Sequence, residues 1–356
     1  MKILIAGICG FVGSTIAKAL AEDSASYQIF GIDNFSRSGS WLNKEKLTKL
    51  GITIHHGDIR NPSDLEAFPK LDWIIDAAAN PSVLAGVDGR TSSFQLIQNN
   101  LYGTVNLLEL CRRHDTGFTL ISTSRVYSIP PLANLSMQQS DRAFYPNPQQ
   151  DFPVGISLKG VAENYSTQPP VSLYGSTKVA SEHLALEYGE TFDFPVWIDR
   201  CGVMAGEGQF GHPGQGIFAF WIHSFREKSS LKYLGFGGNG YQVRDCLHPR
   251  DLLALMKLQF NQPLASDKPR IINVSGGVEN SMSLSQLSDW SEARFGKNEV
   301  IKTDLSRPFD IPWMVLDNRL AKEVWQWQPQ IKITDILQEI AEFAEQNPNW
   351  LNISKM

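Results

Sequence analysis

The chain has few cysteines, no long apolar run and no long run of like charge. Its cysteines form no Cys-x-x-Cys pair, so we expect neither a zinc site nor a disulfide framework, and no bound metal. No stretch is long enough to span a bilayer, so no membrane partner is expected. Acidic residues outnumber basic ones by 37 to 32, which argues against nucleic-acid binding, because that function needs a basic face. The four cysteines are Cys9, Cys111, Cys201 and Cys246.

What the chain does contain is enough apolar sequence for a large core. It has 356 residues, of which 42% are hydrophobic, and this length favours two lobes. The apolar run over residues 2–6 is too short for a signal peptide and ends in glycines, so it predicts a buried strand. The unpaired cysteines are typical of small, buried residues in a reducing compartment. We therefore expect a cytoplasmic location.

The first half of the chain alternates between apolar runs and segments with helical spacing. Repeated strand–helix alternation predicts an α/β fold with a Rossmann-type, doubly wound parallel sheet. The predicted strands cover residues 2–6, 28–32, 52–56, 73–77, 118–122 and 196–200. The predicted helices in this half cover residues 11–21, 94–111 and 174–188.

Two later regions differ from this alternation. Residues 128–171 are rich in Pro, Gln, Asn and Ser without clear periodicity, which is typical of an active-site flap or a mobile insertion. After Arg200 the pattern loosens, and glycine-rich loops separate the predicted helices. Those helices cover residues 217–225, 251–260, 284–294 and 333–343.

Three glycines lie between the first predicted strand and the first predicted helix. Gly7, Gly10 and Gly13 form a Gly-x-x-Gly-x-x-Gly turn. The first glycine permits a tight turn, the second lets backbone approach a pyrophosphate, and the third lets the helix pack on the sheet. The N-terminus of the helix offers free N–H groups and a positive dipole. The turn therefore predicts a dinucleotide site.

Acidic residues follow the second and third predicted strands. Asp33 lies about 20 residues after the glycine turn, where a carboxylate accepts hydrogen bonds from an adenosine ribose. Its charge would repel a 2'-phosphate, so NAD is favoured over NADP, although Arg37 lies near enough to weaken that preference. Asp58 and Ile59 follow the third strand, where they can flank an adenine.

A second set of residues carries reaction chemistry. Tyr174 and Lys178 are four residues apart in a segment with helical spacing, so they share one face. A phenol has a pKa of about 10, and a neighbouring cation lowers it. Thr123 follows the strand predicted over residues 118–122, at the carboxyl edge where doubly wound sheets bind ligands. We expect Tyr174 to act as the base, Lys178 to assist it, and Thr123 to hydrogen-bond the substrate oxygen.

These motifs together resemble the extended short-chain dehydrogenase/reductase family of NAD-dependent nucleotide-sugar epimerases and dehydratases. The resemblance implies NAD as cofactor and a nucleotide-diphosphate sugar as partner. It implies that Thr123 and Tyr174 contact the hydroxyl that is oxidised, and that Lys178 also holds the nicotinamide ribose. It adds more residues to the predicted cofactor site, namely Asn34, Ser36, Arg37 and Asn100.

The resemblance extends to the second half of the chain. Arg244, in an Arg-Asp segment, and Arg307, followed by Pro-Phe-Asp, match arginines that bind the diphosphate. Two guanidinium groups can hold a diphosphate bidentately. Residues 1–200 plus about 236–275 are expected to form the NAD-binding domain, and about 201–235 and 276–356 the nucleotide-sugar lobe. The family also implies a homodimer.

Four stretches of the chain most resemble CDP-tyvelose (CDP-paratose) 2-epimerases. They cover residues 56–61, 163–178, 208–216 and 240–248. Ser124 and Arg125 stand where dehydratases carry an Asp-Glu pair for acid–base chemistry, so dehydration is disfavoured. The resemblance implies inversion at C2 of a CDP-deoxyhexose. The alternatives are a UDP-hexose 4-epimerase, an oxidoreductase with net NAD(P)H turnover, and a non-catalytic dinucleotide sensor.

Overall fold

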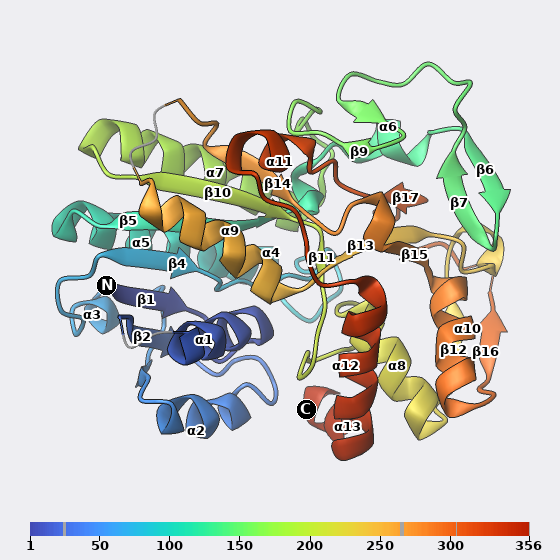
Figure 1. Cartoon of the computed structure of the whole chain (residues 1–356), viewed down its shortest axis with the longest axis horizontal. Coiled ribbons are helices and arrows are strands. Elements are labelled where there is room, and N and C mark those ends of the chain that lie inside the picture. Colours follow the sequence, from blue (N-terminus) through green and yellow to red (C-terminus); the bar gives the residue numbers. More distant parts are fainter. Residues whose placement is uncertain (24–25, 264–266, 304, 356) are drawn as a thin grey trace. The chain divides into compact units, whose positions relative to one another are not determined.

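The computed structural model describes residues 1–23, 26–263, 267–303 and 305–355, which fall into two compact units (Figure 1). Unit 1 comprises residues 1–126, 173–200 and 252–272. Unit 2 comprises residues 127–172, 201–251 and 273–356. The predicted division into an NAD-binding domain and a nucleotide-sugar lobe concerns ligands, and it stays a prediction.

A seven-stranded sheet organises the first unit, with strand order β14-β10-β5-β4-β1-β2-β3 (Figure 1). The registers among β1 to β5 are parallel, and Ala6 pairs with both Ile32 and Asp76. The strand order reverses at β1, as in a doubly wound sheet, so the predicted fold class is confirmed. The strands are β1 Lys2–Ala6, β2 Gln28–Asp33, β3 Thr53–His56, β4 Trp73–Asp76, β5 Gly117–Thr123, β10 Val196–Cys201 and β14 Ile271–Val274.

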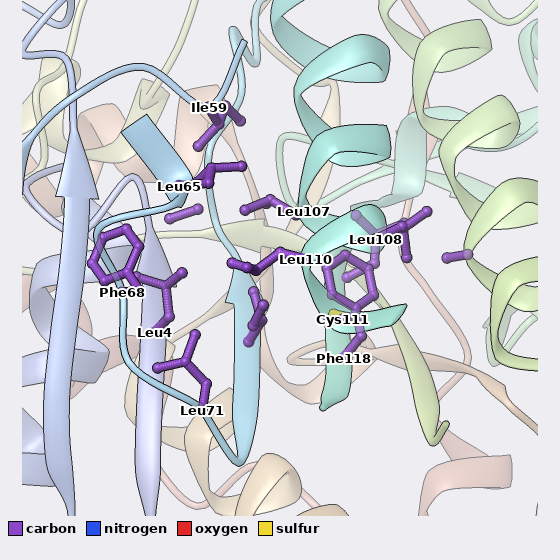
Figure 2. Packing of buried hydrophobic residues seen from close by; sticks show 14 of the residues in the cluster. Leu4, Ile59, Leu65, Phe68, Leu71, Leu107, Leu108, Leu110, Cys111 and Phe118 are labelled. Carbon is purple, nitrogen blue, oxygen red and sulfur yellow. The ribbon is translucent and has the colours of Figure 1, made fainter. Parts of the chain in front are cut away.

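Both faces of this sheet are covered, which is why its strands are continuous apolar runs. Figure 2 shows Leu4 of β1 and Phe118 of β5 packed near Leu107, Leu108 and Leu110 of helix α5 (Gly103–His114). All five side chains are buried. Each buried side chain of this size stabilises the fold by roughly 1.5–3 kcal/mol.

The helix predicted over residues 94–111 differs in the structure. It begins at α4 (Ser93–Ile97) with a capping box, in which the Ser92 and Gln95 side chains bond each other's backbone N–H groups. A π-helical turn, η1 (Gln98–Tyr102), then joins α4 to α5. Because the apolar spacing continues through this turn, the sequence predicted one uniform helix. π-Turns inside helices are frequent at functional sites.

Three other helices of the first half and of the sheet crossovers follow the prediction more closely. The segment predicted over residues 174–188 is part of the longest helix, α7. The helices that follow the prediction are α1 Phe11–Asp23, α7 Ser172–Phe192 and α9 Pro249–Asn261, whereas α2 Trp41–Lys49 and α3 Pro62–Leu65 were not predicted. Strand β14 was not predicted, because its four residues are too short a run to separate from a loop.

Unit 2 contains a small sheet in which β13 is central. Strand β13 (Val243–Leu247) pairs with β11 (Val203–Met204), β15 (Ser281–Ser283) and β17 (Trp313–Met314). A second core, with Trp221, Phe225 and Ile340 among its buried members, joins the helices of this unit. Its remaining elements are α8 Ile217–Glu227, β12 Leu231–Tyr233, η3 Phe236–Gly238, η4 Val278–Asn280, α10 Leu284–Phe295, β16 Val300–Lys302, α11 Arg319–Trp325, α12 Ile333–Gln346 and α13 Trp350–Lys355.

Residues 128–171 contain more regular structure than predicted. Ala143 of the first hairpin is buried with Val243, Trp313 and Val315, so the segment packs against β13 and β17. Two short hairpins give too little alternation for a strand pattern to be recognised in the sequence. The elements are α6 Ile129–Ala133, β6 Met137–Ser140, β7 Ala143–Pro146, β8 Ile156–Ser157 and β9 Gly160–Val161.

The described ranges contain neither a candidate membrane-spanning helix nor a candidate metal-binding cluster. No helix in them combines the length and apolarity needed to cross a membrane. Their His, Cys, Asp and Glu side chains form no group of three that could hold a metal ion. All four cysteines are buried free thiols, as the sequence predicted.

Candidate active site

The glycine turn after β1 has a shape that side chains would prevent. Gly7 has φ +73°, and a β-carbon there would lie 2.9 Å from the Ala78 Cα. A β-carbon on Gly13 would lie only 2.3 Å from the Gly7 carbonyl oxygen. The Gly10 N–H donates to the same oxygen at 3.0 Å, and α1 begins at Phe11. The turn therefore presents bare backbone and a helix N-terminus, which suit a pyrophosphate.

Asp33, the last residue of β2, faces this turn. One carboxylate oxygen accepts from the Cys9 N–H at 2.8 Å, and the other accepts from the Phe35 N–H at 2.8 Å. Burial raises the pKa of Asp33, and these backbone N–H groups only partly oppose the effect. Backbone thus fixes the carboxylate at the tip of β2, beside the turn.

The residues around Asp33 form a polar rim. The Asn34 amide donates to Asp58 at 2.9 Å, and the Ser36 N–H donates to the Asn34 side-chain oxygen at 3.0 Å. Burial raises the pKa of Asp58, but hydrogen bonds from Arg60 and Asn34 outweigh it and bring the pKa to about 2. Arg37 is half-buried, and burial lowers its pKa. The structure therefore places the four predicted residues Asn34, Ser36, Arg37 and Asp58 along the edge next to β2 and β3.

Ile59 lies beneath this rim rather than on it. Its side chain is buried, and a β-carbon on Gly103 would lie 2.5 Å from it. Its carbonyl accepts from the Asn106 amide at 2.8 Å. A shallow depression beside it is lined by Asp58, Arg60, Asn61, Gln98 and Tyr102.

The structure brings the predicted base helix to the strand that carries Thr123. Thr123 ends β5, and its hydroxyl oxygen accepts from the Arg125 N–H at 3.2 Å. Tyr174 and Lys178 lie one turn apart on α7, and both are buried. The Lys178 ammonium donates to the Ile121 carbonyl at 3.0 Å, two residues before Thr123. A hydroxyl, a phenol and an ammonium thus belong to two neighbouring elements at the carboxyl edge of the sheet.

Asn100 lies in the π-turn and is fully buried. Its amide oxygen accepts from the Asn80 N–H at 2.8 Å, and its amide nitrogen donates to the Asn80 carbonyl at 3.1 Å and the Thr177 hydroxyl at 3.3 Å. The Ser181 hydroxyl donates to the Asn100 carbonyl at 3.2 Å. Asn100 therefore ties α7 to the loop after β4, on both sides of Lys178 along the helix.

Sequence reasoning missed a buried ion pair beneath this site. The Arg200 guanidinium donates to Glu182 at 2.6 and 3.0 Å, and the Ser122 hydroxyl also donates to Glu182. Both charged side chains are almost completely buried. One feature of the sequence could have indicated this ion pair. Glu182 is four residues after Lys178 and so lies on the same helix face. The pair fixes α7 against β5 and β10.

A second buried acid, Asp76, was also missed.

The two predicted diphosphate residues belong to unit 2. The Arg244 guanidinium donates to Asp310 at 2.9 Å and to the Ile311 carbonyl at 2.9 Å. Burial lowers the pKa of Arg244, with a further lowering from the nearby charge of Arg307 and an opposing effect from Asp310. Arg307 donates to the Gly214 carbonyl at 3.4 Å and has no carboxylate partner among the described side chains. Asp310 therefore bonds Arg244 directly, and the nearby charge of Asp245 also opposes the lowering of the Arg244 pKa.

The sheet order and glycine turn define a Rossmann-type dinucleotide-binding protein. Comparison with known families agrees, because the model of the NAD dependent epimerase/dehydratase family matches residues 3–275. The chain belongs to this family. It is accordingly an NAD-dependent enzyme, and the predicted cofactor and enzyme class are confirmed.

Individual relatives cover nearly the whole chain. It is 27% identical to a CDP-paratose 2-epimerase of Salmonella typhi over 97% of this chain and 99% of the relative. It is 24% identical to a UDP-glucuronate 4-epimerase of Thermodesulfobacterium geofontis over 97% and 96%. Among solved structures, the Bacillus cereus UDP-glucuronic acid 4-epimerase with UDP-glucuronic acid and NAD matches with a TM-score of 0.75, 25% identity, and coverage of 97% and 99%. The relatives thus include both 2-epimerases and 4-epimerases.

Proposed function

We propose that this protein is a nucleotide-sugar epimerase that inverts C2 of a CDP-linked deoxyhexose through a transient keto sugar. The observation that carries the proposal is the Lys178 ammonium held 3.0 Å from the Ile121 carbonyl, one helical turn from Tyr174 and beside the strand of Thr123. The similarity to a CDP-paratose 2-epimerase over 97% of the chain supports the choice of carbon and nucleotide.

In this proposal Tyr174 is the catalytic base. The Lys178 charge, one turn away on α7, favours the phenolate over the phenol. The phenolate takes the proton of the substrate hydroxyl and later returns it, because epimerisation has no net proton change. Bound NAD would supply the acceptor and the donor of the hydride, so that the cofactor is not consumed. Burial of Tyr174 and Lys178 keeps bulk water from competing for these protons.

Thr123 would act on the same substrate oxygen. Its hydroxyl ends β5 and its own oxygen already accepts from the Arg125 N–H, which leaves the hydroxyl proton to donate. A donor fixed before the reaction stabilises charge on that oxygen without reorganisation. Thr123 thereby lowers the barrier in both directions.

Arg244 and Arg307 would hold the diphosphate. Asp310 bonds Arg244, and among the described side chains Arg307 bonds no carboxylate, so the Arg307 guanidinium can attract a dianion. A bound diphosphate lets the flat keto sugar turn over without leaving the enzyme. The other face of the sugar then receives the hydride, and the configuration is inverted.

We also propose that the protein is a homodimer in the cytoplasm. Large apolar side chains are exposed along α4 and η1, and adjacent exposed apolar side chains mark interaction surfaces. Phe94 is 66% exposed, Ile97 43% and Tyr102 48%. A second copy would cover these side chains. Light scattering of the purified enzyme tests this, and a monomer at micromolar concentration would contradict it.

The second candidate is a 4-epimerase of a UDP-hexose. The 25% identity and TM-score of 0.75 to a UDP-glucuronic acid 4-epimerase favour it. A dehydratase is disfavoured, because Ser124 and Arg125 follow Thr123 and neither supplies a carboxylate for water loss.

A panel of CDP- and UDP-sugars, followed by proton NMR and by NADH absorbance, tests the proposal. We expect CDP-tyvelose and CDP-paratose to interconvert with no accumulation of NADH. Inversion at C4 of a UDP-sugar would support the second candidate instead. Steady NADH production would contradict both and indicate an oxidoreductase, and retained NAD without any turnover would indicate a sensor.

A further inference from the structure

Asp76 is a completely buried acid at the carboxyl end of β4. In the sheet it pairs with Ala6 of β1 on one side and Leu120 of β5 on the other. This is the edge at which the glycine turn and Thr123 lie. Burial of a carboxylate here raises the free energy of the folded state unless hydrogen bonds and an opposite charge compensate for its lost hydration.

The hydrogen bonds are present. The Thr104 hydroxyl lies 2.7 Å from one Asp76 oxygen, and the Ala78 N–H donates to the other at 3.1 Å. The Thr104 hydroxyl oxygen also lies 2.9 Å from the Asn100 carbonyl, which accepts from Ser181 of α7. Thr104 has one proton, and the shorter distance favours the carboxylate. Thr104 therefore bonds the Asp76 carboxylate, and its oxygen lies beside the Asn100 carbonyl that Ser181 of α7 bonds.

The opposite charge comes from Lys178 of α7, whose ammonium reaches the adjacent strand β5. The Lys178 ammonium is bonded to the Ile121 carbonyl, and Ile121 follows Leu120, the residue paired with Asp76. Neighbouring strands are about 4.8 Å apart, so the Ile121 carbonyl that Lys178 bonds lies close to Asp76 in the sheet, and the Asp76 and Lys178 side chains are both buried. Burial raises the pKa of Asp76, and the Lys178 charge is the largest effect that opposes it.

We propose that Asp76 is a positioning residue whose carboxylate is the counter-charge that keeps Lys178 protonated beside Tyr174. The proposal rests on the functions proposed above for Tyr174 and Lys178. A buried ammonium without a counter-charge loses its proton readily, and a neutral Lys178 could not favour the phenolate.

Three other titratable groups on the described elements packed near this pair contribute no net negative charge. On α5, burial and the Asp76 charge hold the pKa of the Cys111 thiol well above its ordinary value, so it stays neutral. On α7 and β10, Glu182 and Arg200 neutralise each other. In the sheet, Asp76 pairs with Ala6 of β1 and Leu120 of β5, and both of these residues are apolar.

The test compares Asp76→Asn in the full-length enzyme with Asp199→Asn, using the pH dependence of kcat/KM. Asp199 is another fully buried acid of the same sheet, on β10, bonded to Gln259 at 2.8 Å. Removing the negative charge at residue 76 lowers the pKa of Lys178 and of Tyr174. We therefore expect both limbs of the profile to move to lower pH, the alkaline limb by about one unit or more. Asp199→Asn should leave both limbs in place. Unchanged limbs in a folded Asp76→Asn enzyme would overturn the proposal.

A double variant covers the case in which Asp76→Asn does not fold. If Asp76 is the counter-charge, Asp76→Asn/Lys178→Met should resist urea better than Asp76→Asn, because both buried charges are gone. No recovery would overturn the proposal. Tyr174→Phe separates this outcome from a failure of the proposed function. If Tyr174→Phe were fully active, the function proposed for Tyr174 would be refuted. If Tyr174→Phe were inactive and the pH profile of Asp76→Asn were unshifted, only the counter-charge role of Asp76 would be refuted.

Discussion

The polar centres of the two units are built differently. In unit 1 the charged groups beneath Tyr174 are buried and matched one to one, as Glu182 with Arg200 shows. In unit 2, Asp310 forms an ion pair with Arg244, and Arg307 lies close enough to lower the pKa of Arg244. Among the described side chains, Glu182 and Arg200 are bonded to each other, whereas Arg307 bonds no carboxylate. The difference supports the proposal that unit 1 carries the reacting groups and that the two arginines of unit 2 bind the diphosphate.

Substitutions in the two centres are therefore expected to have different effects. Changes in the matched centre should lower the rate or the stability, because its groups have no spare partner. Changes in the unmatched centre should weaken substrate binding and leave the fold intact.

The largest effect is expected from Tyr174→Phe. Loss of the proposed base should reduce turnover by roughly 10²–10⁴-fold while bound NAD is retained. The matched control is Tyr188→Phe on the same helix, whose hydroxyl bonds Glu109 at 2.8 Å, away from the site. Turnover assays and the NAD content of the purified variants measure both outcomes. A similar loss in both variants would show that α7 is merely sensitive to substitution.

Glu182→Gln should destabilise the fold more than any other single charge removal in these centres. It leaves the Arg200 charge buried and unpaired, which costs about 3–5 kcal/mol. Urea denaturation followed by fluorescence measures the change. The control is Glu345→Gln in unit 2, which breaks an exposed pair with Arg294 and should leave the midpoint nearly unchanged. Equal midpoints for the two variants would contradict the matched-centre description.

Arg244→Gln and Arg307→Gln should act on substrate affinity. Each removes charged hydrogen bonds worth about 1.5–3 kcal/mol, which corresponds to roughly a 10- to 100-fold rise in KM. Arg319→Gln is the control, because that arginine is 62% exposed and paired with Asp317. Steady-state kinetics with the accepted nucleotide sugar measure the change. A fall in kcat at constant KM would reverse the assignment of unit 2.

The smallest effect concerns Asp58 on the outer rim of unit 1. Its pKa falls from an ordinary value near 4 to about 2, so its contribution to stability is complete above pH of about 4 and is lost as pH falls through about 2. Partial exposure limits that contribution to about 1 kcal/mol. Urea denaturation of Asp58→Asn should therefore differ from the wild type at neutral pH and converge with it in acid. A constant difference down to the lowest pH would rule out this ionisation.

The sequence was most informative where backbone geometry restricts the residue type. Gly7 and Gly13 were recognisable because any side chain would collide with backbone within 3 Å. The meeting of Thr123 with the helix of Lys178 followed from parallel strands, whose carboxyl ends share one edge. Such features depend on local pattern and on a topology that strand–helix alternation already specifies.

The buried charges were not predictable in the same way. Glu182 and Asp76 belong to residue types that are normally exposed, and their burial depends on Arg200 and Lys178, which are distant in sequence or on another element. The π-turn at Asn100 does not interrupt the apolar spacing, so no sequence pattern marks it. These features arise from tertiary packing, where propensity carries little information.

The most direct measurement is turnover of the nucleotide sugar in deuterated water, followed by NMR of the product. Hydride removal and return on the enzyme should leave the inverted carbon free of deuterium. Deuterium at that carbon would mean that it had been deprotonated, and the hydride shuttle built on Tyr174 and Lys178 would be wrong.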